Sequence, residues 1–144
     1  MIDKLLRMVG LQRWRRQTNL FQTGKFTLAS GLKSDFKIEC DALTDEDWDT
    51  IAFHLRDYAE EFGEVIGVPR GGLKLARALQ KFCDSGNVSG PRLVVDDVIT
   101  TGGSIRKLMT RPTDVGLVLF ARDIDRLPPG VCALFTMTNW RRFP

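Results

Sequence analysis

LVVDDVITTGGS, residues 93–104, is the stretch that decides the fold. It begins as an apolar, β-branched run typical of a buried strand and ends in a loop of threonine and glycine that precedes a helical pattern. Glycine lets the backbone approach a ligand closely, and the free N–H groups at the start of a helix attract anions. The sequence therefore predicts a phosphate site in this loop, at Thr100, Thr101, Gly102, Gly103 and Ser104.

Two adjacent carboxylates, Asp96 and Asp97, come just before the loop. They would repel a phosphate unless they face something else, and the partners that suit them are sugar hydroxyls or a bound divalent cation. A phosphorylated ribose would satisfy the carboxylates and the loop together. The alternative is a strand that merely turns into a helix, which is less favoured because ionised groups at the end of a buried strand are costly.

The run from Val94 to Ser104 resembles the phosphoribosyl-pyrophosphate (PRPP) binding motif of the type I phosphoribosyltransferases. The resemblance implies that Asp96 and Asp97 form the catalytic acidic pair and hold the ribose 2- and 3-hydroxyls, while the loop after them wraps the 5-phosphate. It also implies Mg2+ as the cofactor, carried by PRPP, so that the two acids meet the metal indirectly.

A second glycine loop follows the strand predicted at residues 64–68. A helical stripe from Leu75 to Cys83 comes after it, so strand, loop and helix repeat the order of the first motif. A simple Pro/Gly turn would also explain the pattern. In the resembled family this loop binds the pyrophosphate of PRPP, often through an unusual peptide geometry, and an arginine in it would add a charge-assisted contact. The residues concerned are Pro69, Arg70, Gly71 and Gly72.

Residues 20–43 contain short alternating runs punctuated by glycine and serine, which predict short strands and turns. The pattern Phe-x-Leu-x-Ser-Gly-x-x-Ser at 26–34 resembles the N-terminal segment of orotate phosphoribosyltransferases, a small hood above the sheet that receives the base. The family usually has a lysine at the position of Ala29, and Lys33 or Lys25 is the candidate to replace it. The base-binding residues that the resemblance implies are Lys33, Phe36 and Arg122. Arg126 is the second choice for the role of Arg122. The alternative is that Arg122 is only a surface charge at the end of a strand.

Four apolar runs predict strands, near residues 64–68, 92–96, 115–121 and 131–136. Helical patterns separate the earlier ones. This order predicts an α/β fold with a mainly parallel central sheet flanked by helices and joined by right-handed crossovers, together with the small N-terminal hood. We expect residues 1–144 to form a single phosphoribosyltransferase-like domain.

The clearest helix signal begins at Thr44, where Asp47 three residues on completes a capping box. Apolar residues at helical spacing up to Phe62, Tyr58 among them, form one stripe, so this helix is expected to lie on the core. His54 lies at the border of the stripe and is not expected to be catalytic.

Little chain separates the two glycine loops. After a helix and a strand only residues 84–91 remain as a loop, whereas the resembled family has an additional strand and a long mobile loop with basic catalytic residues. The favoured function is an enzyme, a phosphoribosyltransferase that transfers the 5-phosphoribosyl group from PRPP to a nucleobase, orotate or a similar pyrimidine, and releases pyrophosphate. The alternative is a weakly active or inactive PRPP- or nucleotide-binding regulator that contacts nucleic acid or a partner protein through the basic residues 1–25.

Composition bounds the other possibilities. The chain has 144 residues, 43% of them hydrophobic, and a net charge of +3. No apolar run approaches the ~20 residues of a membrane span, and the absence of a signal-peptide pattern predicts a cytoplasmic protein. Residues 2–9 are expected to form a short helix, with a solvated basic cluster at 13–16. The resemblance implies a homodimer, and nucleic acid is the less favoured partner. Three cysteines without metal-ligand spacing are expected to be reduced core residues: Cys40, Cys83 and Cys132.

Overall fold

The computed structural model describes residues 18–58 and 61–137. The sequence predictions for residues 2–9, 13–16 and the basic tail at 139–144 lie outside these ranges. Within the ranges, no helix is long and apolar enough to cross a membrane. The strands are β1 (Phe21–Thr27), β2 (Lys33–Ile38), β3 (Glu64–Gly67), β4 (Arg92–Ile99), β5 (Val115–Ala121) and β6 (Val131–Thr136), and the α-helices are α2 (Asp45–Leu55), α3 (Leu73–Leu79) and α4 (Gly103–Leu108).

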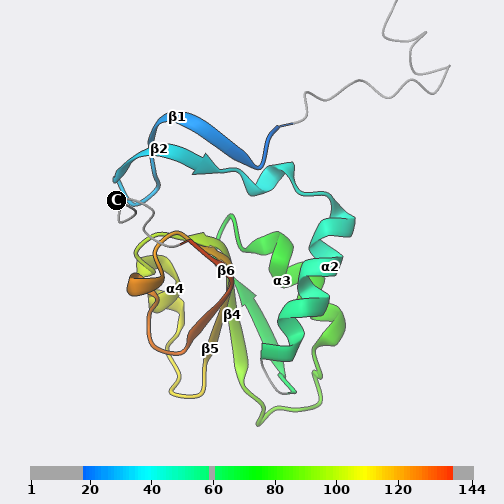
Figure 1. Cartoon of the computed structure of the whole chain (residues 1–144). Helices are drawn as coiled ribbons and strands as arrows, with labels where there is room; N and C mark the ends of the chain where they lie inside the picture. Colours follow the sequence, from blue (N-terminus) through cyan, green and yellow to red (C-terminus); the bar gives the residue numbers. More distant parts are fainter. Residues whose placement is uncertain (1–17, 59–60, 138–144) are drawn as a thin grey trace, which may run out of the picture.

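The central sheet is parallel throughout and has the order β3-β4-β5-β6. Because helices or loops cover both faces of the sheet, residues 93–95 of β4 and the whole of β5 form apolar runs without polar side chains. The residues of 93–95 and 117–119 are each at most 1% exposed. The predicted α/β fold with a parallel sheet is confirmed (Figure 1). Strand β4 runs three residues further than predicted, to Ile99, since Val98 and Ile99 still pair with β5.

Helices lie on opposite faces of the sheet. On β4, Leu93 and Val95 contact one apolar cluster, which also contains Leu75 of α3 and the buried residues of α2. Val94, between them in the strand, contacts the second cluster with Ile105 of α4. Successive side chains of a strand point to opposite faces, so α2 and α3 cover one face and α4 covers the other.

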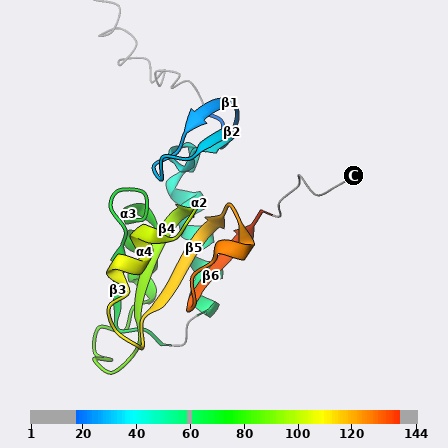
Figure 2. The ribbon, with the colours of Figure 1, turned by 90° about the vertical axis from the view of Figure 1, so that its left-hand side faces the viewer.

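The two helical crossovers have opposite hands. Both β3–α3–β4 and β4–α4–β5 move one strand along the sheet in the same direction, but their helices lie on opposite faces. In Figure 2 the strands follow one another from β3 to β6, left to right, with α4 in front, so β4–α4–β5 is right-handed and β3–α3–β4 is left-handed. The expectation of right-handed crossovers throughout is therefore wrong for the first one, a hand seen in only about 2% of such connections.

The hood predicted at residues 20–43 is an antiparallel hairpin of β1 and β2. Its turn is closed by a hydrogen bond from the N–H of Leu28 to the carbonyl of Leu32, 2.8 Å long. Figure 1 shows the hairpin above the carboxyl ends of the parallel strands. The ring of Phe21 meets that of Phe120 on β5 edge-on, with 5.7 Å between centroids, and so anchors the hairpin to the sheet.

The capping box at the start of α2 is confirmed. The N–H of Asp47 donates to Thr44 Oγ1 over 3.1 Å, and the N–H of Thr44 donates to Asp47 Oδ2 over 2.8 Å. Trp48 is buried on this helix as predicted. The helix ends at Leu55, however, and a short 3-10 helix turns the chain so that Tyr58 is 49% exposed. Tyr58 is therefore not part of the core stripe.

All three cysteines are free, as expected for reduced residues. Cys40 is buried and Cys83 is half-buried. Cys132 is exposed on β6, so the expectation that it belongs to the core is wrong.

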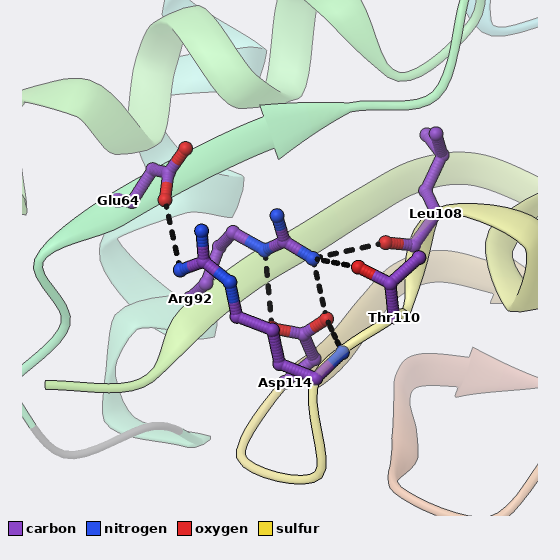
Figure 3. Close-up of polar contacts among 6 residues, drawn as sticks. Glu64, Arg92, Leu108, Thr110 and Asp114 are labelled. Carbon is purple, nitrogen blue, oxygen red and sulfur yellow. Dashed lines mark hydrogen bonds and ion pairs between the residues drawn. The ribbon is translucent and has the colours of Figure 1, made fainter.

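A buried ion pair ties the amino-terminal ends of β4 and β5 to the end of α4 (Figure 3). Arg92 donates to both carboxylate oxygens of Asp114, through Nε over 3.0 Å and Nη2 over 2.6 Å. Its Nη2 also donates to the carbonyl of Leu108 over 3.1 Å and to Thr110 Oγ1 over 3.0 Å. Burial alone would raise the pKa of Asp114, but hydrogen bonds from Arg92 and from the N–H of Arg111 outweigh it and lower that pKa. The carboxylate therefore stays charged inside the fold.

Candidate functional site

The two glycine loops lie at the same edge of the sheet. Strands β3 and β4 are parallel neighbours, with Gly67 opposite Val95, so the loops that follow them meet at the carboxyl ends of the strands. A hydrogen bond from the N–H of Val68 to the carbonyl of Val95, 2.8 Å long, holds the start of the Pro/Gly loop (residues 69–72) against β4. The Thr/Gly loop (residues 100–104) follows the same strand.

The Thr/Gly loop lines a cavity of about 210 Å³, here called the Thr/Gly cavity. Gly102 has φ of +74°, a conformation that favours glycine, and a Cβ placed there would lie 2.4 Å from Pro128 Cγ. The loop can therefore take this shape only with glycine at that position. The other residues that line the cavity come from the hood, from β4 and from α4: Ala29, Ser30, Asp96, Val98, Ile99, Ile105 and Lys107.

The Pro/Gly loop lies against the acidic pair. A Cβ on Gly71 would lie 2.3 Å from Asp97 Oδ1, and one on Gly72 would lie 2.3 Å from the carbonyl oxygen of Val95. Glycine is therefore needed at both positions for the loop to approach β4 this closely. The peptide bond between Pro69 and Arg70 is cis. A cavity of about 360 Å³, here called the Pro/Gly cavity, is lined by Arg70, Gly71 and Asp97 together with Glu39, Cys40, Asp41, Trp48, Leu73 and Lys74.

The acidic pair lies within β4 rather than after it, and its two side chains face different cavities. Asp96 lines the Thr/Gly cavity, and Asp97 lines the Pro/Gly cavity, as expected for neighbours on a strand. Asp96 is only 8% exposed, and its Oδ1 accepts a hydrogen bond of 2.9 Å from the N–H of Asp97. Burial, followed by the charge of Asp97, raises the pKa of Asp96 to about 7. At neutral pH this carboxyl can therefore gain or lose a proton readily.

Two of the three residues predicted to bind the base lie together. The guanidinium carbon of Arg122 is 3.8 Å from the centroid of the Phe36 ring. Its Nη2 donates to Ser34 Oγ over 2.6 Å and to the carbonyl of Phe36 over 3.2 Å, so it joins the end of β5 to the hood. Burial lowers the pKa of Arg122. Lys33 lines a cavity of about 460 Å³ on the hairpin, together with Lys25 and with Ser34, the residue to which Arg122 donates.

The structure also brings residues to this edge that the sequence did not single out. Lys107 lines the Thr/Gly cavity, and its position four residues after Gly103 in a helix was a signal that could have found it. Cys40 and Trp48 line the Pro/Gly cavity, and no local pattern pointed to either. Burial, together with the Asp97 charge, raises the pKa of Cys40 to about 12, so its thiol stays protonated and is no nucleophile.

Two glycine loops beside an acidic pair, at the carboxyl edge of a parallel sheet and below a hood, are the arrangement of a phosphoribosyltransferase. No protein-family model matches the chain. Orotate phosphoribosyltransferase of Carboxydothermus hydrogenoformans is 33% identical over an alignment 130 residues long, and the match covers 72% of this chain and 68% of that relative. The chain therefore belongs to the type I phosphoribosyltransferase family, with orotate phosphoribosyltransferase as its named relative, and it is an enzyme of that family.

Solved structures support the same fold. The orotate phosphoribosyltransferase of Aeropyrum pernix has a TM-score of 0.61 at 22% identity, covering 95% of this chain and 94% of that one. The UMP synthase of Leishmania donovani has a TM-score of 0.62 at 18% identity over 82% of this chain. This chain spans only 34% of the length of that synthase.

Proposed function

We propose that the chain transfers the 5-phosphoribosyl group from PRPP to orotate or a similar pyrimidine and releases pyrophosphate. The observation that carries this proposal is the contact between Asp97 and Gly71, because it joins the acidic pair to the Pro/Gly loop at the edge where the Thr/Gly loop also lies. One ligand with a phosphate at each end of a sugar fits such an edge. The similarity to the orotate phosphoribosyltransferase of Carboxydothermus hydrogenoformans supports orotate as the acceptor.

Each part of the edge has a role in this proposal. The backbone N–H groups and hydroxyls of residues 100–104 bind the 5-phosphate. Asp96 and Asp97 accept hydrogen bonds from the ribose 2- and 3-hydroxyls. Residues 69–72 bind the pyrophosphate, to which Arg70 donates charge-assisted hydrogen bonds.

The reaction breaks the bond between C1 of the ribose and the pyrophosphate oxygen and forms a bond from C1 to a ring nitrogen of the base. That nitrogen loses its proton, which leaves with the pyrophosphate or passes to water. Positive charge develops on the sugar and negative charge on the leaving group. Arg70 and the N–H groups of the Pro/Gly loop stabilise the leaving group, and the Asp97 carboxylate, which lies against Gly71 of that loop, offsets the positive charge on the sugar. Holding donor and base in line supplies much of the remaining rate.

The acidic pair suits Mg2+ that arrives with PRPP. In residues 18–58 and 61–137 there is no cluster of three or more His, Cys, Asp or Glu side chains placed to hold a metal. Mg2+ is commonly bound by one or two carboxylates plus substrate phosphates and water, which is the donor set available here. When bound, the ion would neutralise charge on the pyrophosphate.

Arg122 is the residue we expect to recognise the acceptor. Among residues 18–58 and 61–137, only its Nη2 makes hydrogen bonds, which leaves Nε and Nη1 to donate to a carboxylate. Phe36 stacks on the guanidinium and fixes its plane. Orotate carries a carboxylate that uracil lacks, so the pair predicts a preference for orotate.

The test follows pyrophosphate release when the chain is incubated with PRPP, Mg2+ and a panel of bases. We expect release with orotate, little with uracil, and none after chelation of Mg2+. Arg122→Lys should raise KM for orotate by about tenfold or more, because lysine cannot make the bidentate contact. Arg77→Lys, at an exposed position of α3 that lines none of the cavities described above, serves as the matched control. No release with any base from a chain that still binds PRPP would refute the transferase and favour a regulator.

Three associated predictions concern the whole protein. The homodimer implied by the family stays a prediction, which light scattering coupled to gel filtration can test. The cytoplasmic location and the single domain stay predictions as well.

A further inference from the structure

The Thr/Gly cavity has an uneven distribution of charge. Its acid is Asp96, on β4, and among the described residues its only lysine or arginine is Lys107, on α4. The opposite wall, contributed by the hood, consists of Ala29 and Ser30, which carry no charge. A phosphate in this cavity would bring about two negative charges at neutral pH. Lys107 is therefore the side chain that can balance them.

Backbone groups alone offer limited stabilisation here. Helix α4 runs only from Gly103 to Leu108, so few peptide dipoles add up along its axis. Asp96 shares the cavity and, when ionised, repels a phosphate. A positively charged side chain near the loop would offset both effects.

The helix places Lys107 correctly for this purpose. Residues four apart lie on the same face of a helix, so Lys107 lies one turn below Gly103. The Cα–Cβ bonds of a helix tilt toward its amino terminus, which here is the Thr/Gly loop, so the long lysine side chain leans toward that loop. Lys107 is exposed, and its ammonium group can reach a phosphate without first being buried. Arg106, its neighbour, does not line the cavity.

We propose that Lys107 is a binding residue for the 5-phosphate of PRPP and supplies the cation of that subsite. This inference rests on the proposed function, because it assumes that the Thr/Gly cavity receives the 5-phosphate end of the donor. It adds a side-chain contact from α4 to a subsite otherwise made of backbone groups and hydroxyls.

The test measures binding by calorimetry with three probes: PRPP, ribose 5-phosphate and pyrophosphate. Lys107→Met should weaken PRPP and ribose 5-phosphate by about the same factor, roughly tenfold, because one charge-assisted contact is lost at a partly exposed site. Its affinity for pyrophosphate should not change. Arg106→Met, which removes the same charge one residue away, should leave all three affinities within about twofold. Added salt should weaken binding to the unmodified chain more than to Lys107→Met.

A rescue variant separates charge from structure. Ala29→Lys in the Lys107→Met background places a cation on the opposite wall of the same cavity, and we expect it to recover much of the lost affinity for ribose 5-phosphate. Equal affinities for Lys107→Met and the unmodified chain, or equal losses in Lys107→Met and Arg106→Met, would overturn the inference. Failure of the rescue would overturn it too, since Lys107 would then act through α4 and not through its charge. If the unmodified chain binds neither PRPP nor ribose 5-phosphate, it is the proposed function that fails.

Discussion

Replacing Asp96 by asparagine should make the protein more stable at high pH. The carboxyl is 8% exposed, and its pKa rises from 3.8 to about 7 inside the fold, first because of burial and then because of the charge on Asp97. That difference corresponds to an upper limit of about 4 kcal/mol when the group must ionise, at about 1.4 kcal/mol per pKa unit. Relaxation and water reduce it, so we expect a gain of about 1–3 kcal/mol from Asp96→Asn.

The pH dependence of the proton on Asp96 determines whether the substitution raises or lowers the free energy of unfolding. Between pH 4 and 7 the folded protein holds a proton on Asp96 that the unfolded chain has released. The free energy of unfolding therefore falls as pH rises through this window and levels off above the folded pKa. Asp96→Asn removes this contribution, because the amide does not ionise and its oxygen can still accept from the N–H of Asp97. The variant should exceed the unmodified chain at pH 8 and match it near pH 4.

Urea unfolding of both proteins at pH 4.5 and pH 8 measures the effect. Asp57→Asn is the control, because this side chain is 74% exposed and its charge change should shift stability equally little at both pH values. The reasoning is refuted if Asp96→Asn is no more stable than the unmodified chain at pH 8, or if its gain is the same at both pH values. The same variant should bind PRPP more weakly, so stability and ligand binding would change in opposite directions.

Three further substitutions test the elements that support the site. Arg92→Met should lower the free energy of unfolding in urea by about 3–5 kcal/mol, because it leaves the Asp114 carboxylate buried without its partner. Adding Asp114→Asn should recover part of the loss. Additive losses from the two substitutions would show that the two side chains do not interact. Gly102→Ala should cost about 1–3 kcal/mol and weaken ribose 5-phosphate binding, because of its positive φ and the contact with Pro128; unchanged binding would contradict this. Thr44→Ala should lower the free energy of unfolding by about 1 kcal/mol through loss of the N-cap, whereas Thr44→Ser should largely keep it.

The parts of the fold that could be predicted are those that depend on residues close together in the sequence. The apolar run at 115–121 became β5 with the same bounds, and the capping box at Thr44 starts α2. Two strand-loop-helix motifs in a row placed both glycine loops at one edge, because parallel strands put their carboxyl ends together. These features depend on side-chain periodicity and backbone chemistry, which a sequence displays directly.

Contacts between distant residues could not be read in the same way. The ion pair between Arg92 and Asp114 joins the start of β4 to the residue before β5, and no sequence pattern near either residue predicts it. Strand β4 extends through the acidic pair because it pairs with β5 there. The sequence alone therefore did not show that the side chains of Asp96 and Asp97 point in opposite directions. Tyr58 fitted the helical period but lies after the helix ends. That Lys33 shares a cavity with Lys25 and Ser34 depends on how β1 and β2 pair.

The left-handed crossover accompanies a short connection between α3 and β4. If the sheet had one more strand at its edge, next to β3, helix α3 could connect β3 to that strand by a right-handed crossover on the same face. The chain would then pass back over β3 to reach β4. In the described part, the residues between α3 and β4 form a short 3-10 helix (η3, Gln80–Phe82) and a loop, but no strand. The chain therefore passes directly from α3 to β4, and this short connection has no room for the additional strand and long mobile loop that the resemblance to the family implies. Among the described residues, the lysines and arginines that line the two cavities are Arg70 and Lys74 on the Pro/Gly side and Lys107 on the Thr/Gly side, and we expect these side chains to act on a phosphorylated donor.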